Sequence, residues 1–243
     1  MFSMSKQVYG WKRFWCPRSG SINFDVGYLY DPDGEWGKAS NPDLVTLETI
    51  SHLPCLALLG EPGIGKTQTL KMERSEIFNK IQEQGDQVLS LDLRQYGSED
   101  RLVCCLFDSS EFKAWLAGTH KLHIFLDSFD ECLLRVDTLA ALLVDEFKRH
   151  QDVIHRLCLR IACRTAVWPS VLEEGLKEIW GKNSLGVYEL APLRRVDVIA
   201  AAKAEEFSAD AFLGEVGQKN SVSLAIKPIT LGFFAEYLPP LWC

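Results

Sequence analysis

One eight-residue stretch constrains this chain more than any other feature: Gly60-Glu61-Pro62-Gly63-Ile64-Gly65-Lys66-Thr67. It fits a pattern of glycine, four free positions, and then glycine, lysine and a hydroxyl residue. Glycine adopts backbone dihedral angles that are closed to other residues, so successive N–H groups can turn toward one anion. We therefore name residues 60–67 the phosphate loop.

The side chains that end this loop supply the rest of a nucleotide site. Lys66 is a mobile positive charge that can reach the β- and γ-phosphates, and the Thr67 hydroxyl is a ligand for Mg²⁺. Gln68 follows at the start of the expected helix, whose positive N-terminal end also favours phosphate. We predict that residues 60–68 contact a nucleoside triphosphate.

The flanking sequence agrees with this prediction. Residues 54–59 form a continuous apolar run, as expected of a buried parallel strand. Downstream, Leu70, Ile77, Phe78 and Ile81 fall on one face at helical spacing. Strand, glycine loop and helix occur in the required order, which disfavours the alternative of a glycine-rich turn with a surface lysine.

The composition and net charge of the chain limit its possible fold class and binding partners. The chain has 243 residues, of which 47% are hydrophobic and 24% charged, and this fits one α/β domain with a small appendage. The formal net charge of −7 argues against a protein that coats nucleic acid through charge alone. A basic cluster near the N-terminus has two explanations, a contact surface or cations lying over packed aromatic rings, and the second is the commoner. The cluster is Lys6, Lys12, Arg13 and Arg18, among Trp11, Phe14 and Trp15.

The location is predicted to be cytoplasmic. The eight cysteines form no CxxC pair and no secreted-type framework. No apolar stretch approaches the roughly 20 residues that cross a bilayer, and the first residues are too polar for a signal peptide.

Strands and helices alternate from residue 54 onward. The predicted strands are residues 54–59, 88–93, 122–127, 157–163 and 187–190. The predicted helices are one after the phosphate loop, one from Ser110 as its cap, and others over 138–150 (capped by Asp137), 170–180, 196–207, 209–216 and 230–237. This alternation predicts a three-layer P-loop α/β sandwich, with a five-stranded, mainly parallel sheet covered on both faces. We divide the chain into an irregular lead-in (1–50), the core (51–193) and a helical segment (194–243).

A second motif follows the third strand. Asp127 ends that strand, and Asp130 and Glu131 come one turn later. A buried strand holds its terminal carboxylate at the carboxyl edge of the sheet, where ligands bind in open α/β folds. Asp127 is therefore predicted to hold Mg²⁺ opposite Thr67, and Asp130 or Glu131 to activate the attacking water. The alternative is an acidic helix N-terminus without a catalytic role.

The two motifs together resemble the NACHT branch of the STAND-class P-loop ATPases. The resemblance rests on GEPGIGKT at 60–67, FLDSFDE at 125–131, IACRT at 161–165, YELAPL at 188–193 and KPITL at 227–231. It implies that Arg164 reads the γ-phosphate as a sensor arginine, from a fourth strand beside the first, and that Pro228 lies near the adenine. Ser128 stands where many members carry glycine. The lead-in, with CRTAVWP at 163–169, looks most like large bacterial STAND proteins of antiviral defence.

The resemblance also implies a function. Such proteins sense a foreign molecule, bind ATP and oligomerise, with a winged helix and repeats after the ATPase module; this chain ends at Cys243, so a truncated product is expected. The leading hypothesis is a slow Mg²⁺-ATPase that acts as a conformational switch, with ATP and ADP as ligands and self-association or a partner protein through the missing region. The alternative is a module that binds nucleotide without hydrolysing it, or an inactive fragment. A GTPase is disfavoured because no Asn-Lys-x-Asp sequence is present. A small-molecule kinase is disfavoured because no arginine-rich lid is evident.

Overall fold

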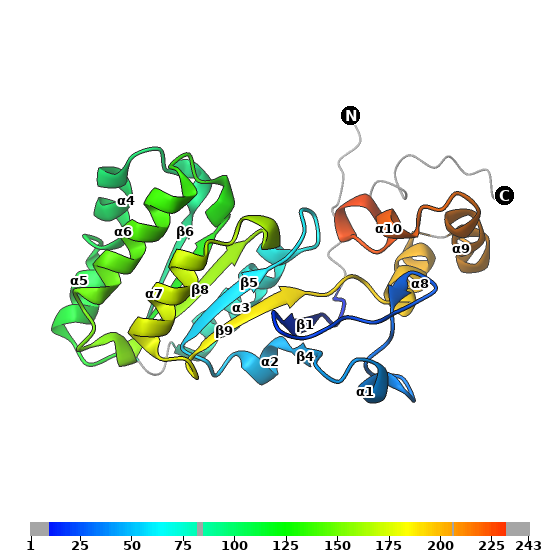
Figure 1. Ribbon diagram of the computed structural model, residues 1–243, viewed down its shortest axis with the longest axis horizontal. Helices are drawn as coiled ribbons and strands as arrows, with labels where there is room; N and C mark the ends of the chain where they lie inside the picture. The colour runs from blue at the N-terminus through cyan, green and yellow to red at the C-terminus, as the bar shows by residue number, and fades with distance from the viewer. Residues whose placement is uncertain (1–9, 82–84, 206, 232–243) are drawn as a thin grey trace.

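A mainly parallel seven-stranded sheet forms the centre of the fold (Figure 1). The computed structural model describes residues 10–81, 85–205 and 207–231. The strand order is β4-β1-β9-β5-β8-β7-β6. The strands are β1 (Phe14–Pro17), β4 (Val45–Thr46), β5 (Cys55–Leu59), β6 (Gln87–Asp92), β7 (Leu122–Asp127), β8 (Leu157–Cys163) and β9 (Leu185–Leu190).

All five predicted strands form, and they pair in parallel as β9-β5-β8-β7-β6. The fourth of them, β8, lies directly beside the first, β5, as expected. Two further strands come from the lead-in, where β1 pairs antiparallel with both β9 and β4. These strands have four and two residues, too few for a periodic pattern in the sequence to reveal them. The lead-in also forms a small hairpin of β2 (Phe24–Asp25) and β3 (Tyr28–Leu29).

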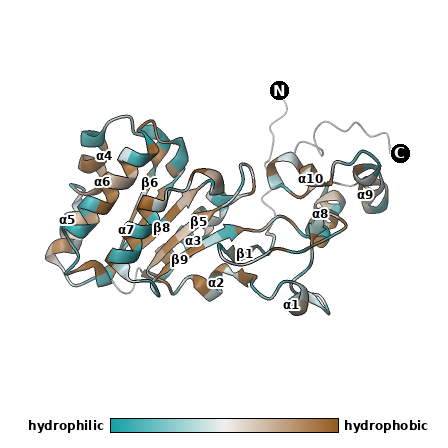
Figure 2. Ribbon diagram, viewed as in Figure 1, coloured by the Kyte–Doolittle hydropathy of each residue, from teal (hydrophilic) through white to brown (hydrophobic). Residues whose placement is uncertain are grey.

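Helices cover both faces of the sheet. The helices are α1 (Gly37–Ser40), α2 (Leu47–Ile50), α3 (Lys66–Ile81), α4 (Glu99–Leu106), α5 (Ser110–Ala117), α6 (Val136–Lys148), α7 (Ser170–Trp180), α8 (Arg195–Ala204), α9 (Ala209–Gln218) and α10 (Val222–Ala225). Because side chains alternate along a strand, β5 serves two cores. Cys55, Ala57 and Leu59 pack with α4–α7, whereas Leu56 and Leu58 pack with α3. The result is the predicted three-layer sandwich. Its central strands are mostly hydrophobic, and the helices that cover them carry both hydrophobic and hydrophilic residues (Figure 2).

Several local expectations need correction. Ser109, not Ser110, caps α5, because its side chain accepts the N–H of Phe112. Asp137 lies inside the first turn of α6 and does not cap it, although a carboxylate there still favours the helix N-terminus. The helix predicted over 196–207 ends at Ala204, and α4 and α10 were not predicted. Residues 228–231 are helical, and the rest of the helix predicted over 230–237 lies outside the described residues.

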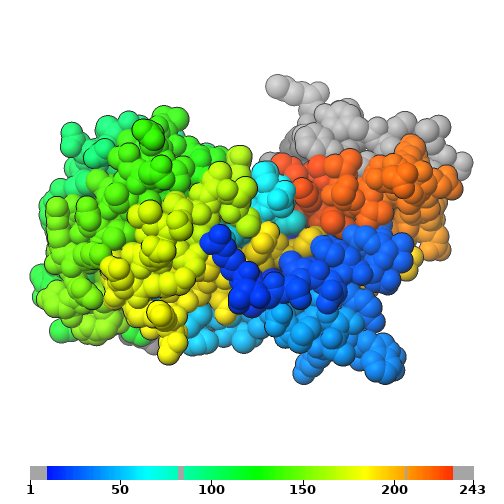
Figure 3. All heavy atoms as spheres, viewed as in Figure 1, coloured from blue at the N-terminus to red at the C-terminus, as the bar shows by residue number. Residues whose placement is uncertain are grey.

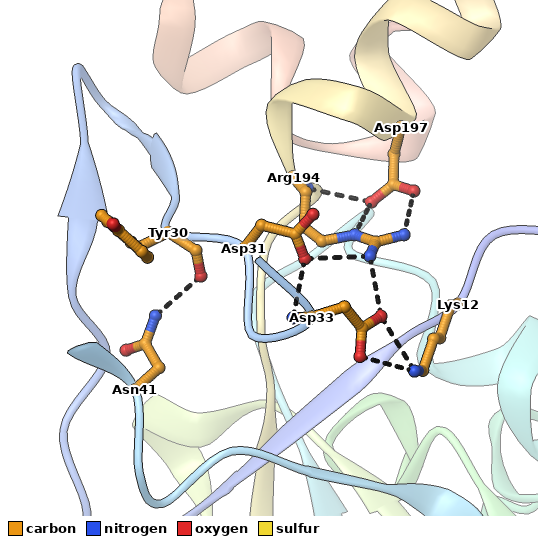
Figure 4. Close-up of polar contacts among 7 residues, drawn as sticks. All are labelled: Lys12, Tyr30, Asp31, Asp33, Asn41, Arg194 and Asp197. Atoms are coloured by element: carbon orange, nitrogen blue, oxygen red, sulfur yellow. Dashed lines mark hydrogen bonds and ion pairs between the residues drawn. The ribbon is translucent and has the colours of Figure 1, made fainter. Parts of the chain in front are cut away.

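The lead-in is tied to the helical segment by a polar hub around Arg194 (Figure 4). Its guanidinium donates to Asp31 at 3.0 Å, to Asp33 at 3.2 Å and to Asp197 at 2.8 Å. Lys12 adds a 2.7 Å contact to Asp33. Asp197 and Asp31 raise the pKa of Arg194, with the hydrogen bonds to Asp197 as the largest cause. The hub therefore joins segments that are more than 160 residues apart in sequence.

Helix α3 is anchored to the sheet by a buried ion pair. Arg160, in β8, donates from Nε to Glu73 Oε1 of α3 at 2.7 Å, and the two side chains are only 3% and 4% exposed. The same guanidinium donates to the carbonyls of Ser51 and Leu53, at 2.7 and 2.9 Å. The predicted apolar face of α3 is therefore interrupted by a charged residue, and Phe78, expected on that face, is 53% exposed.

Glu73→Ala tests this anchor. Removing one partner of a buried ion pair leaves the other charge uncompensated, so the free energy of unfolding should fall by about 3–5 kcal/mol. Glu76→Ala, an exposed glutamate on the same helix, should change it by less than about 0.5 kcal/mol. Urea unfolding followed by circular dichroism measures both variants. Equal effects would mean that the pair does not anchor α3.

Candidate functional site

The phosphate loop connects β5 to α3 at the carboxyl edge of the sheet. Gly63 and Gly65 have φ values of 74° and 107°, which other residues rarely adopt. Neighbours also crowd both positions: a Cβ on Gly63 would lie 2.2 Å from Ile229, and one on Gly65 would lie 2.9 Å from Arg13. The loop therefore favours glycine at both positions for its turn, and at Gly63 also because Ile229 packs closely against it.

Lys66 folds back over the loop. Its Nζ donates to the carbonyls of Gly60 at 2.7 Å and of Glu61 at 3.1 Å. Burial lowers the pKa of Lys66, and the nearby carboxylate of Asp130 opposes this effect. A half-buried ammonium group beside the backbone of the phosphate loop can stabilise the phosphates of a nucleotide.

Thr67 and Asp127 lie face to face. The Thr67 hydroxyl donates to Asp127 Oδ1 at 3.2 Å, and the Ser128 N–H donates to the same oxygen at 2.9 Å. Ser128 has a φ of 58°, a conformation that glycine adopts more readily. Burial raises the pKa of Asp127, while the hydrogen bonds from Thr67 and Ser128 lower it. A hydroxyl and a carboxylate so placed can hold Mg²⁺ between them.

Asp130, Glu131 and Arg164 form one ion-pair group. The Arg164 backbone N–H donates to Asp130 Oδ1 at 2.9 Å, and its Nε lies 2.8 Å from Asp130 Oδ2. Its Nη2 donates to Glu131 Oε1 at 3.1 Å. Asp130 is 6% exposed and has both oxygens engaged, whereas Glu131 is 41% exposed. Glu131 is therefore the better placed of the two acids to contact a water molecule.

The remaining predicted contact residues surround the loop. Ile64 is buried, and Glu61, Pro62 and Gln68 are exposed. Residues 227–231 lie against the loop, where the Ile229 N–H donates to the Gly63 carbonyl at 3.3 Å. Pro228 lies 3.8 Å from the position that a Cβ on Gly65 would occupy. Figure 3 shows the loop at the surface between the sheet layers and this segment, which is coloured red.

Arg13 also reaches the phosphate loop, which the sequence did not indicate. Its guanidinium donates to the carbonyls of Ile64 at 2.8 Å and of Ala191 at 2.7 Å. Burial lowers the pKa of Arg13 to about 10, against the opposing charge of Asp197. Within its cluster, Lys12 does lie over an aromatic ring, 5.3 Å from the centroid of Phe14. No local motif marks Arg13, because its contacts lie 51 and 178 residues away.

A cavity of about 250 Å³ opens beside Thr67 and Asp127, on the β6 side. Its charged lining includes Lys71, Arg74, Asp92 and Arg94. Asp92 ends β6 in register with Asp127 at the end of β7, so two carboxylates lie side by side at the sheet edge. Neither Asp92 nor Arg94 was among the predicted site residues, although Asp92 has the same signal as Asp127, an acid at the end of an apolar strand.

Comparisons with known proteins give little beyond this geometry. No family model matches the chain, and no curated protein matches it. Among solved structures, the chain is similar to the Thermotoga maritima RuvB Holliday junction branch migration motor, with 13% identity and a TM-score of 0.43. The match covers 78% of this chain and 56% of that one, so this chain spans little more than half of its length. The fold stated above therefore rests on the sheet topology itself.

The described residues contain neither a candidate membrane span nor a large cluster of metal-ligating side chains. None of their helices has both the length and the apolar character needed to span a membrane. None of their His, Cys, Asp and Glu side chains gather in groups of three or more that could hold a metal ion. Magnesium in nucleotide sites needs only one or two protein carboxylates, because phosphate oxygens and waters supply the other ligands.

Asp127→Asn tests the electrostatics of the predicted metal position. The raised pKa means that the folded protein binds this proton more tightly than the unfolded chain, so the ionised carboxylate costs stability at neutral pH. Asparagine is uncharged and keeps an oxygen for Thr67 and Ser128. In EDTA the variant should have the higher Tm at neutral pH, and the gain should shrink as the pH falls through the raised pKa. A pH-independent gain, or a loss of stability, would contradict this account.

Proposed function

We propose that the chain is a Mg²⁺-ATP-binding module that hydrolyses ATP slowly and acts as a nucleotide-dependent switch. The observation that carries the proposal is the meeting of the phosphate loop, Thr67–Asp127 and the Asp130–Glu131–Arg164 group at one sheet edge. Loop amides and Lys66 would bind the phosphates, and Thr67 and Asp127 would hold Mg²⁺. This metal supplies charge neutralisation when it is bound.

Each remaining residue has a role in this proposal. Glu131 would position or deprotonate the attacking water, because it is the accessible acid. Asp130 would act as a positioning residue that fixes Arg164 at the end of β8. Pro228 and its neighbours would pack near the base, since they lie against the phosphate loop at Gly63 and Gly65. Membership of the NACHT-type STAND class, a role in antiviral defence and a cytoplasmic location are part of the proposal, and they rest on the sequence resemblance and composition alone.

A second candidate is a module that binds ATP without hydrolysing it. One observation favours it: Arg164 contacts both oxygens of Asp130 and one oxygen of Glu131, and these contacts weaken both carboxylates as acceptors of a proton from water. The two candidates share every binding residue, so only turnover separates them. We propose self-association or binding of a partner protein for either candidate function.

Lys66→Ala tests nucleotide binding. The ammonium group makes charge-assisted contacts to phosphate, so affinity for a fluorescent ATP analogue should fall by about 10- to 100-fold or more. Lys80→Ala, an exposed lysine at the other end of α3, is the matched control and should bind normally. Circular dichroism checks that both variants fold. Normal affinity in folded Lys66→Ala would reject the phosphate-loop assignment. Slow phosphate release by the wild-type chain, lost in this variant, supports hydrolysis; binding without release supports the second candidate.

Arg164→Ala tests the sensor role. A guanidinium at the end of β8 lies on the strand beside β5, from which the phosphate loop starts, and it keeps its charge at every relevant pH. A contact to the third phosphate adds to ATP affinity but not to ADP affinity. The variant should therefore lose about 10- to 100-fold in ATP affinity alone. Calorimetric titration of both nucleotides measures the ratio, and an unchanged ratio means that Arg164 is a structural arginine after a buried strand.

A further inference from the structure

Glu131 follows β7 and lies between two arginines that follow the strands on either side of β7. Its Oε1 is 3.1 Å from Arg164, which follows β8, and its Oε2 is 4.0 Å from Arg94, which follows β6. The three side chains are 41%, 44% and 53% exposed. Ion pairs this open to water are weak, so the carboxylate can change partners at little cost.

The two arginines are each fixed at one end. Asp130 forms an ion pair with the Nε of Arg164, and Asp92 accepts from both Nε and Nη2 of Arg94. The Nη2 of Arg164 and the Nη1 of Arg94 are the atoms directed at Glu131. Glu131 therefore has one close arginine partner and a second one within a short movement.

The second partner also lines a space next to the metal position. Arg94 borders the cavity of about 250 Å³ that Thr67 and Asp127 line as well. A side chain that moves toward Arg94 thus moves along the edge of the site, away from the end of β8.

A third phosphate would compete with Glu131 for Arg164. Carboxylate and phosphate oxygens accept from the same guanidinium N–H groups, and the two anions also repel each other. ADP lacks the third phosphate and would leave the Arg164–Glu131 pair in place. A contact between Arg164 and the third phosphate therefore requires the loss of the Arg164–Glu131 ion pair.

We propose that Arg94 is a positioning residue of the nucleotide site, which receives Glu131 when Arg164 turns to the third phosphate. The proposal rests on the proposed function, in that it requires Arg164 to contact ATP. Arg94 lowers the cost of releasing Glu131 and holds the released carboxylate beside the metal position. Glu131 in turn restrains Arg164 until a triphosphate binds.

The first experiment measures binding without turnover. Calorimetry compares ADP with an ATP analogue whose last two phosphates are joined by a non-hydrolysable imido bridge, both with Mg²⁺. Glu131→Gln should raise affinity for the analogue by about two- to fivefold, the range of an exposed ion pair, and leave ADP affinity unchanged. Arg94→Met should lower affinity for the analogue by a similar factor, again without changing that for ADP. Arg74→Met is the matched control: Arg74 lines the same cavity but is bonded to Ser90, so its loss should change neither affinity.

A double-mutant cycle ties the effect to Arg164. In the Arg164→Ala background the restraint is absent, so Glu131→Gln should no longer raise affinity for the analogue. Three results overturn the role of Arg94: Glu131→Gln shifting both nucleotides equally, Arg94→Met behaving as Arg74→Met, or the Glu131→Gln gain persisting without Arg164. A folded wild-type chain that binds neither nucleotide would instead reject the proposed function, and this inference with it. Thermal unfolding shows that each variant is folded.

Discussion

The complete burial of β5 is the constraint on which the site depends. All five of its residues are buried, and the strand pairs in parallel with β8 on one side and β9 on the other. A strand in that position cannot shift without breaking two ladders and two cores. Its last residue, Leu59, therefore fixes where Gly60 begins the phosphate loop. The buried pair between Glu73 and Arg160 then fixes α3, so both ends of the loop are held.

The site carries charges that burial opposes. The pKa of Lys66 is lowered and that of Asp127 is raised, in both cases mainly because the charged form loses its hydration. A phosphate near Lys66 and a metal ion near Asp127 would return the favourable partners that water no longer supplies. Groups that are costly in the isolated protein and satisfied by a ligand are a usual feature of binding sites. This is a physical reason to expect affinity for a metal-bound phosphate compound at this edge.

Much of the fold could be predicted from the sequence, because its patterns are local. Strands β7 and β8 and helix α7 form over the predicted residues, since each is a continuous apolar or amphipathic stretch with clear ends. The phosphate loop and Asp127 could be located for a similar reason, since their positions relative to a strand are set by the motif. Strands β1 and β4 could not, because they are short and gain their stability from pairing with β9 and with each other. The sequence pattern wrongly predicted that Phe78 is buried. The face of α3 that packs on the sheet includes the charged residue Glu73, which is buried because it pairs with Arg160.

The sequence did not reveal contacts between distant segments, and these contacts surround the phosphate loop. Arg13 from the lead-in donates to the Ile64 carbonyl, and Ile229 from the helical segment donates to the Gly63 carbonyl. The lead-in and the helical segment are themselves joined through Arg194. A change in the backbone of residues 63–65 would therefore act on two segments that are already coupled to each other. A switch needs such a connection between a ligand and a larger body, and here hydrogen bonds from two distant segments to the backbone carbonyls of Gly63 and Ile64 can provide it.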